Sequence, residues 1–183
     1  SHAKSIGYIP KSITAAEAIV KLTFDTTGYD PSYIIMEKGT QFVSNITGVP
    51  LPFTNLATIN IFPDEGGEFN GEVKLYQGEL KALEWTYEAL SETQSFLIKD
   101  DTCDRSTIRM LVNDKPWEIN TNLSELNNTS NIFFIQEGLD GTSEIYFGNG
   151  IFGKIPLDGQ SVKVTYLSTS GARGNYTSTI NEQ

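Results

Sequence analysis

The chain has very little of two residue types on which many enzymes and metal sites depend. Its 183 residues include one cysteine, Cys103, and one histidine, His2. A single cysteine cannot form an internal disulfide bond, so the fold does not depend on an oxidising compartment. A catalytic thiol needs a histidine nearby, and a common zinc site needs several such ligands. We therefore expect no zinc site, and we interpret Cys103 as a partly buried structural thiol and not as half of a Cys103–His2 catalytic pair.

Basic residues are also scarce. The 13 lysines and arginines face 23 aspartates and glutamates, which gives a formal net charge of −10. A nucleic-acid backbone or an anionic membrane surface requires clustered Lys and Arg, so we expect neither as a partner. The acidity is explained by solubility or, alternatively, by complementarity to a basic partner.

Long apolar runs and familiar catalytic motifs are missing too. No segment is long enough to span a bilayer, and residues 1–5 do not resemble the start of a signal peptide. The usual nucleotide-loop, metalloprotease, CxxC and nucleophile-elbow patterns are absent. We therefore expect no enzyme activity and no catalytic residue, cofactor, metal ion or small-molecule substrate. Because the chain does not begin with Met, we expect it to be a fragment of a larger one.

Short β patterns separated by turns make up what is present. Apolar and polar residues alternate over residues 16–24 and 161–167, as a half-buried strand requires. Shorter strands are predicted at 33–36, 41–46, 58–62, 96–98, 107–112, 117–119, 131–136 and 144–147, with one helical turn at 121–126. The predicted fold is mainly β, with antiparallel strands in a sandwich-like or meander arrangement and at most one or two short helices.

Several positions are expected to join or interrupt these strands. Residues 37–40 predict a hairpin connection, and residues 113–116 predict a turn at which Pro116 blocks strand continuation. Pro50 and Pro52 should keep residues 49–53 out of a sheet interior, because proline cannot donate to the ladder.

Residues 71–90 are ambiguous. Helical spacing is found at Leu80, Leu83, Tyr87 and Leu90, whereas Leu83, Trp85, Tyr87 and Ala89 alternate as in a strand. The local pattern leaves both structures open.

The chain is expected to have four parts. A connector covers residues 1–15, a first β subdomain covers 16–70, and a second β subdomain covers 71–168. The glycine-containing loop at 63–67 indicates the boundary, and a mobile C-terminal tail is expected at 169–183.

Two acidic groups offer the oxygen ligands that a hard cation prefers. They are Asp100, Asp101 and Asp104, and Asp64, Glu65 and Glu68. The first group lacks the spacing of an EF-hand loop and a glycine for its sharp turn, and the second is discounted in the same way. We interpret both groups as solvated loops and not as calcium sites.

The most informative stretch is residues 144–156. Asn149-Gly150 between Phe147 and Ile151 predicts a β-hairpin with a type I′ turn. Gly148 and Gly153 mark places where two backbones can approach closely or a strand can kink. No helix follows, so this is not a phosphate-binding loop.

Residues 145–156, followed by 158–159 and 162–166, resemble the FGDG-hydrophobic-x-G-x-x-P segment and trailing strand of the baseplate J-like family. That family includes baseplate wedge proteins of T4-like contractile-tailed phages. Residues 3–10, 37–42, 77–79 and 106–117 are similar to further family segments in the same order. Asn149 departs from the usual Asp, and the family implies a strand where residues 80–90 also suit a helix.

The resemblance implies a structural wedge subunit of a contractile-tail baseplate, located in the virion and assembled in the host cytoplasm. Its implied partners are other baseplate wedge subunits and copies of itself, and it would transmit the conformational change of infection. We expect Gly150→Val to damage folding or assembly. The alternative is a β-sandwich carbohydrate-binding or adhesin module, in which Trp85, Trp117 and Tyr146 would stack on sugars instead of packing in a core.

Overall fold

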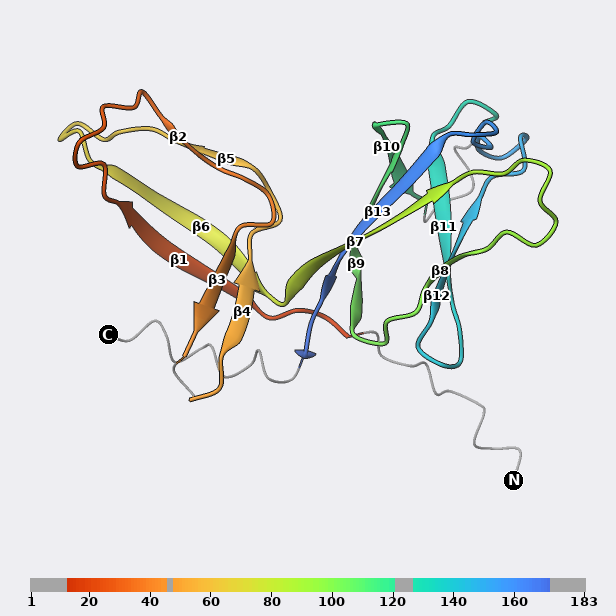
Figure 1. The fold of residues 1–183 in the computed structure, drawn as a ribbon, viewed down its shortest axis with the longest axis horizontal. Coiled ribbons are helices and arrows are strands. Elements are labelled where there is room, and N and C mark those ends of the chain that lie inside the picture. Colours follow the sequence, from red (N-terminus) through yellow and green to blue (C-terminus); the bar gives the residue numbers. More distant parts are fainter. Residues whose placement is uncertain (1–12, 46–47, 121–126, 172–183) are drawn as a thin grey trace.

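The computed structural model describes residues 13–45, 48–120 and 127–171. These residues form strands and turns without an α-helix, which confirms the mainly β prediction (Figure 1). The strands are β1 (Glu17–Phe24), β2 (Ile34–Met36), β3 (Gln41–Ser44), β4 (Leu51–Thr54), β5 (Ile59–Ile61), β6 (Phe69–Gln77), β7 (Glu79–Thr86), β8 (Phe96–Ile98), β9 (Cys103–Val112), β10 (Lys115–Ile119), β11 (Ile132–Glu137), β12 (Ser143–Phe147) and β13 (Ser161–Ser168).

The first lobe, β1 to β6, contains a four-stranded sheet in the order β1-β6-β4-β3 and a two-stranded ribbon of β2 and β5. β1 pairs antiparallel with β6 along its whole length, from Glu17 opposite Tyr76 to Phe24 opposite Phe69. The alternating side chains of β1 are half-buried on one face and exposed on the other. They cover a small core whose centre is Phe53, Val73 and Leu75.

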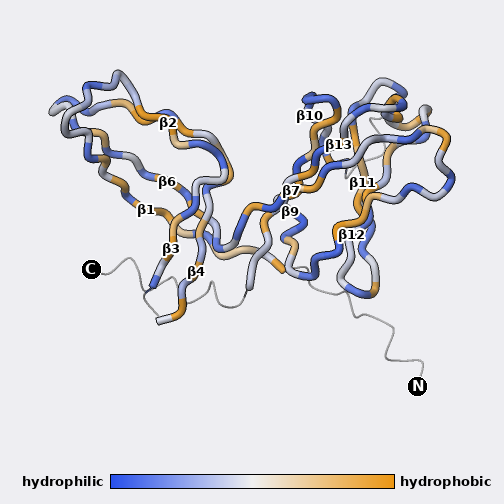
Figure 2. The backbone as a smooth tube through the Cα atoms, viewed as in Figure 1, coloured by the Kyte–Doolittle hydropathy of each residue, from blue (hydrophilic) through white to orange (hydrophobic). Residues whose placement is uncertain are grey.

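The second lobe, β7 to β13, is one seven-stranded sheet in the order β7-β13-β9-β10-β11-β12-β8. β13 is central, because it pairs with β7 on one side and β9 on the other. Its Val162 and Val164 are fully buried, together with Phe133 and Ile145 from β11 and β12. Figure 2 shows the hydrophobic residues along β11 and β12. The pair of β10 and β11 is parallel.

The two lobes lie side by side and are joined where β6 runs into β7 (Figure 1). Residues 71–90 are therefore mostly strand, and the tertiary pairing of β7 with β13 resolves the local ambiguity in favour of β structure. The change of sheet falls at Gly78, later in the chain than the expected boundary after residue 70. Gly78 is required there, because a Cβ atom would lie 2.3 Å from the carbonyl oxygen of Ser168.

Two predictions about residues 37–53 are wrong. Residues 37–40 form a turn, but β2 pairs with β5 and β3 pairs with β4, so no hairpin joins β2 to β3. β4 carries Pro52 and yet lies between β3 and β6. The proline is tolerated because β4 pairs with β6 only at Phe53 and Thr54, while the Pro52 carbonyl accepts a hydrogen bond from Gly78 N–H.

The turn at Asn113 and Asp114 has positive φ at both residues, 48° and 62°, and connects β9 to β10 as expected. Pro116 does not block the next strand, because it lies within β10 opposite Leu111. A prolyl residue is accepted in such a strand when its missing N–H is not needed by the ladder. The helical turn predicted at 121–126 lies outside the described residues.

Candidate functional site

The joint between the lobes is built from buried polar groups. Gln77 ends β6 with 2% exposure, and its Oε1 accepts hydrogen bonds from Thr169 Oγ1 at 2.6 Å and from Ser170 N and Oγ at 3.1 Å. Thr54 Oγ1 donates to the Gly78 carbonyl at 2.7 Å. Buried polar atoms are costly unless paired, so these bonds specify one relative placement of β4, β6 and the end of β13.

A second link crosses from β9 to the start of the first lobe. Asp104 is 3% exposed, and its Oδ2 accepts the N–H of Ala15 at 2.8 Å. Its Oδ1 accepts the N–H and hydroxyl of Ser106 at 3.0 and 2.6 Å. The interpretation of Asp104 as part of a solvated loop is therefore wrong, because β9 begins one residue earlier and the carboxylate is needed inside the joint.

Asp100 belongs to a different network. Its Oδ2 accepts hydrogen bonds from Lys81 Nζ and Tyr166 Oη, both at 3.0 Å, and its Oδ1 accepts bonds from Thr102. Burial opposes ionisation, but these donors prevail and hold the pKa of Asp100 well below its usual range. Burial, and then the hydrogen bond to Asp100, raise the pKa of Tyr166.

The acidic groups do not form a metal site in the described part of the chain, where no cluster of His, Cys, Asp and Glu could hold an ion. Asp64 lies in a loop, as interpreted, and its Oδ1 accepts the N–H groups of Gly66 and Glu68 at 2.9 Å. The hydrogen bond from Glu68, followed by that from Asn70, lowers the pKa of Asp64. This carboxylate therefore organises its own turn.

Cys103 is buried at the start of β9 with 4% exposure. Burial, and then the charge of Asp100, raise the pKa of its thiol to about 12, which keeps it protonated and unreactive. This environment agrees with a structural thiol. The other member of the disfavoured pair, His2, lies outside the described residues.

The two tryptophans pack in the core of the second lobe. Trp117 is 6% exposed and meets Phe147 edge-on, with the ring centroids 5.5 Å apart. Trp85 meets Phe96 in the same way at 5.5 Å. Tyr146 remains exposed and donates its hydroxyl to Glu144 at 2.6 Å. The alternative of a sugar-stacking surface therefore loses two of its three rings, because Trp85 and Trp117 pack in the core.

The glycine-rich stretch after β12 is a compact loop and not the predicted hairpin. β12 pairs with β11 and β8, and no strand begins before β13. Gly150 has a φ of 82°, but Asn149 is not among the positive-φ residues, so the turn is not type I′. Instead, Asn149 Oδ1 accepts the N–H groups of Ile151 and Phe152 at 2.9 and 2.8 Å.

Close packing explains two glycines of this loop, and at Gly148 the contact is between backbones, as predicted. A Cβ on Gly148 would lie 2.4 Å from the carbonyl oxygens of Phe152 and Gly153. A Cβ on Gly153, where φ is 87°, would lie 2.7 Å from Ile132 Cγ1. The loop is thus pressed against itself and against β11, and hydrogen bonds from Gly153 N to Asn127 O and from Lys154 N to Ser130 O anchor it.

Large apolar side chains project from this rigid loop into solvent. They are Ile151, Phe152, Ile155 and Leu157. Phe152 also lines a hollow of about 300 Å³ with Phe134 and Phe147. A concentration of exposed apolar groups on a fixed backbone is typical of a protein–protein contact surface.

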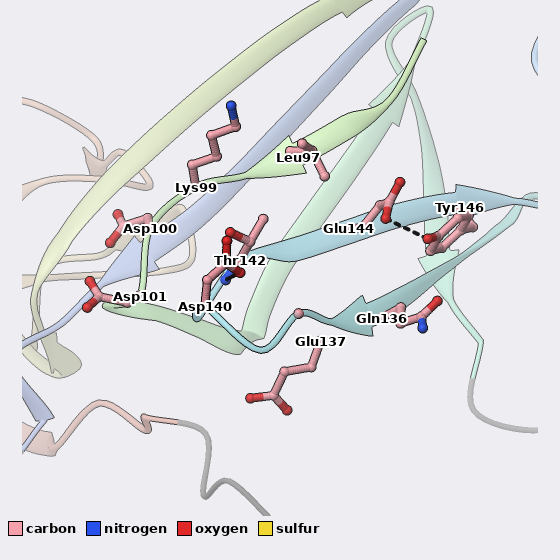
Figure 3. A pocket seen from close by; sticks show the side chains of 11 residues that line it. Leu97, Lys99, Asp100, Asp101, Gln136, Glu137, Asp140, Thr142, Glu144 and Tyr146 are labelled. Atoms are coloured by element: carbon pink, nitrogen blue, oxygen red, sulfur yellow. Dashed lines mark hydrogen bonds between the residues drawn. The ribbon is translucent and has the colours of Figure 1, made fainter. Parts of the chain in front are cut away.

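An open hollow of about 610 Å³ lies between the β8–β9 connection and the β11–β12 hairpin (Figure 3). Carboxylates dominate its lining: Asp100, Asp101, Glu137, Asp140 and Glu144, with Lys99 as the basic residue. Several of these groups are already paired, since Glu137 binds Arg105 at 2.9 Å and Asp140 accepts the N–H of Thr142. The hollow has an acidic surface, and four of its carboxylates, Asp100, Glu137, Asp140 and Glu144, bind groups of the surrounding structure.

These features define a β-sheet module in which two lobes meet at a buried polar joint and the second lobe carries an exposed apolar loop. No helix in the described ranges is long and apolar enough to cross a membrane.

Residues 79–179, more than half of the chain, match the family described as the third domain of bacteriophage baseplate wedge protein gp6. The chain belongs to this family, and the match begins at the first residue of β7. It is also 28% identical, over 193 aligned positions and 94% of its length, to baseplate wedge protein gp6 of Enterobacteria phage T4. The alignment covers 29% of that relative. The resemblance to T4-like baseplate wedge proteins seen in the sequence is confirmed.

Proposed function

We propose that this chain is a non-enzymatic structural module of a phage contractile-tail baseplate wedge. In this role it contacts other wedge subunits and copies of itself, and it passes on the conformational change that accompanies infection. It would be located in the virion tail baseplate after assembly in the host cytoplasm. The observation that carries the proposal is the family match, which spans the second lobe.

The geometry supports a mechanical role. A force transmitted between subunits requires a module that does not deform, and the two lobes are linked by buried hydrogen bonds at Gln77 and at Asp104. The rigid loop that carries Ile151 and Phe152 offers a fixed apolar contact. We also propose that the two lobes are the two β subdomains, with their boundary at Gly78.

Complementation of the parent phage gene tests this function. Variants of the full-length protein would be supplied to a phage that lacks it, and infective titre and baseplate structure by cryo-electron microscopy would be measured. We expect Phe152→Asp to lower the titre because it places a charge on the apolar contact, while the purified protein stays folded. Tyr29→Asp is the control, because Tyr29 is an exposed aromatic residue of the first lobe.

Particles in which density for this chain lies outside the baseplate would contradict the proposal. A normal titre for Phe152→Asp would remove the loop as a contact surface and leave the baseplate location standing.

A further inference from the structure

A groove crosses the outer face of β7, β13 and β9, on the side where the first lobe approaches. Its volume is about 550 Å³. The register places Ala82, Thr165 and Arg109 in one row across the three strands. In the next row, Lys163 lies between Glu84 and Leu111.

The floor of the groove is apolar, and its depth has a simple cause. Leu80, Ala82 and Leu111 line it, and Ala82, two residues after Leu80 on β7, is too small to fill the space. The β2–β3 turn of the first lobe forms one wall, because a Cβ on Gly39 would lie 3.2 Å from Leu80 Cδ2. From this turn Lys38 reaches over the sheet, with its Nζ 3.4 Å from Thr165 Oγ1.

The cations of this groove are poorly compensated. Arg109 Nη1 donates to the carbonyls of Ser106 and Ile108 at 3.0 and 2.9 Å. Neither Lys38 nor Arg109 has a carboxylate within ion-pair distance in the ranges that the structure covers. Burial, and then the charge of Arg109, lower the pKa of Lys38.

The other charges do not remove this excess. Lys163 has only a long contact of 3.8 Å with the exposed Asp114. Glu84 is the carboxylate of the lining, and its Oε1 accepts a hydrogen bond from Ser161 Oγ at 2.9 Å. A local excess of positive charge over an apolar floor, on a chain of net charge −10, favours an occupant that is both apolar and acidic.

We infer that the groove receives an acidic segment of a partner protein, in which a carboxylate side chain neighbours a large apolar one. The apolar side chain would fill the space over Ala82 and contact the neighbouring leucines of the groove. The carboxylate would lie between Lys38 and Arg109 and compensate both. The inference rests on the proposed function in one respect, namely that the occupant is a polypeptide and not a small anion.

Fluorescence anisotropy with the full-length protein tests the groove directly. The probe is a labelled short peptide with a Leu-Asp-Leu-Glu centre between Gly-Ser ends, and its counterpart carries lysine in place of both acidic residues. We expect the acidic peptide to bind, and to bind more weakly as the salt concentration rises. The lysine peptide should not bind. Free aspartate and acetate at the same concentrations should not compete.

Two variants probe the charges and the shape separately. Lys38→Glu should weaken binding of the acidic peptide about tenfold or more. Ala82→Phe should weaken it by a similar factor because it fills the hollow without changing any charge. Lys21→Glu is the matched control, because it makes the same charge change on the exposed face of β1 and should leave the dissociation constant unchanged. Circular dichroism melting curves establish that each variant is folded.

Equal binding of the acidic and lysine peptides, or an acidic peptide that does not bind, would overturn the inference. Unchanged binding in both Lys38→Glu and Ala82→Phe would overturn it as well, and competition by free acetate would reassign the groove to small anions. None of these results affects the proposed function, which fails only if the chain is found outside the baseplate.

Discussion

The two lobes consist of the same kind of short strand, but they differ greatly in the core that they bury. In the described residues, the cluster of the first lobe contains five buried residues and that of the second lobe contains twelve. Every inward side chain of β1 is only half-buried, whereas Val162 and Val164 of β13 are fully buried. Stability follows buried apolar area, so we expect the second lobe to fold first and the first lobe to depend on the joint.

The largest expected effect comes from the core of the second lobe. Phe133→Ala should lower the free energy of unfolding by about 3–5 kcal/mol. The Phe133 side chain is 1% exposed, so its removal leaves a cavity in the core. Hydrogen exchange should then increase in both lobes, since the joint is lost with the second lobe. The matched variant Phe53→Ala, at 4% exposure in the first lobe, should increase exchange in that lobe alone. Full protection of the first lobe in Phe133→Ala would show that it folds independently.

The next largest effect is expected at the joint between the lobes, outside both hydrophobic cores. Asp104→Ala should cost about 2–3 kcal/mol, because the buried Ala15 N–H and the Ser106 groups lose a charged acceptor. Exchange should increase at the start of β1 while β11 and β12 remain protected. Asp140→Ala, in an exposed turn, is the control and should change exchange only near Thr142. An unchanged β1 in Asp104→Ala would mean that the Gln77 contacts alone hold the lobes together.

A smaller effect tests the glycine loop of the second lobe with a matched pair. Gly153 and Gly159 have φ values of 87° and 80°, but only at Gly153 would a Cβ atom meet another group, Ile132. Gly153→Ala should therefore destabilise the protein by about 1–3 kcal/mol more than Gly159→Ala. Chemical denaturation measures both values. Equal losses would show that backbone conformation, and not close packing, requires the glycine.

The smallest effect concerns pH. The pKa of Asp100 is lowered on folding, so its contribution to stability is present above its unfolded value of about 3.8 and is lost as pH falls below it. Thermal melting from neutral pH down to acid pH should show this loss, and Asp100→Asn should reduce its slope. Asp100 pairs with Lys81 within the second lobe, so the loss of stability originates in that lobe. Identical slopes in the two proteins would exclude Asp100 as a source of the acid sensitivity.

Predictions from sequence succeeded where the signal is local. Alternation located β1 and β13 nearly to the residue, and the Asn113-Asp114 turn has the positive φ values that its residue types permit. The close backbone approach at Gly148 was also predicted correctly, because only a glycine leaves room there for a second backbone.

Predictions failed where the outcome depends on a distant partner. Asn149-Gly150 is a strong hairpin signal, but β12 already pairs with β8 and β11, which leaves no free edge for a following strand. Asp104 resembled a loop residue because its buried partner, Ala15, is far away in the chain. No local pattern reports the cations of the groove either, since Lys38 and Arg109 are brought together only by the docking of one lobe on the other.

By itself the sequence determined the class of fold, the positions of most strands and, through the order of its family segments, the kinship with baseplate wedge proteins. Side-chain alternation and turn chemistry are properties of neighbouring residues, so they can be seen without a structure. Only the tertiary structure decided which strands pair, where one sheet gives way to the other, and which carboxylates are buried. These outcomes depend on contacts between distant segments, such as β1 with β6 and β7 with β13. The residue pattern within a single segment does not specify such contacts.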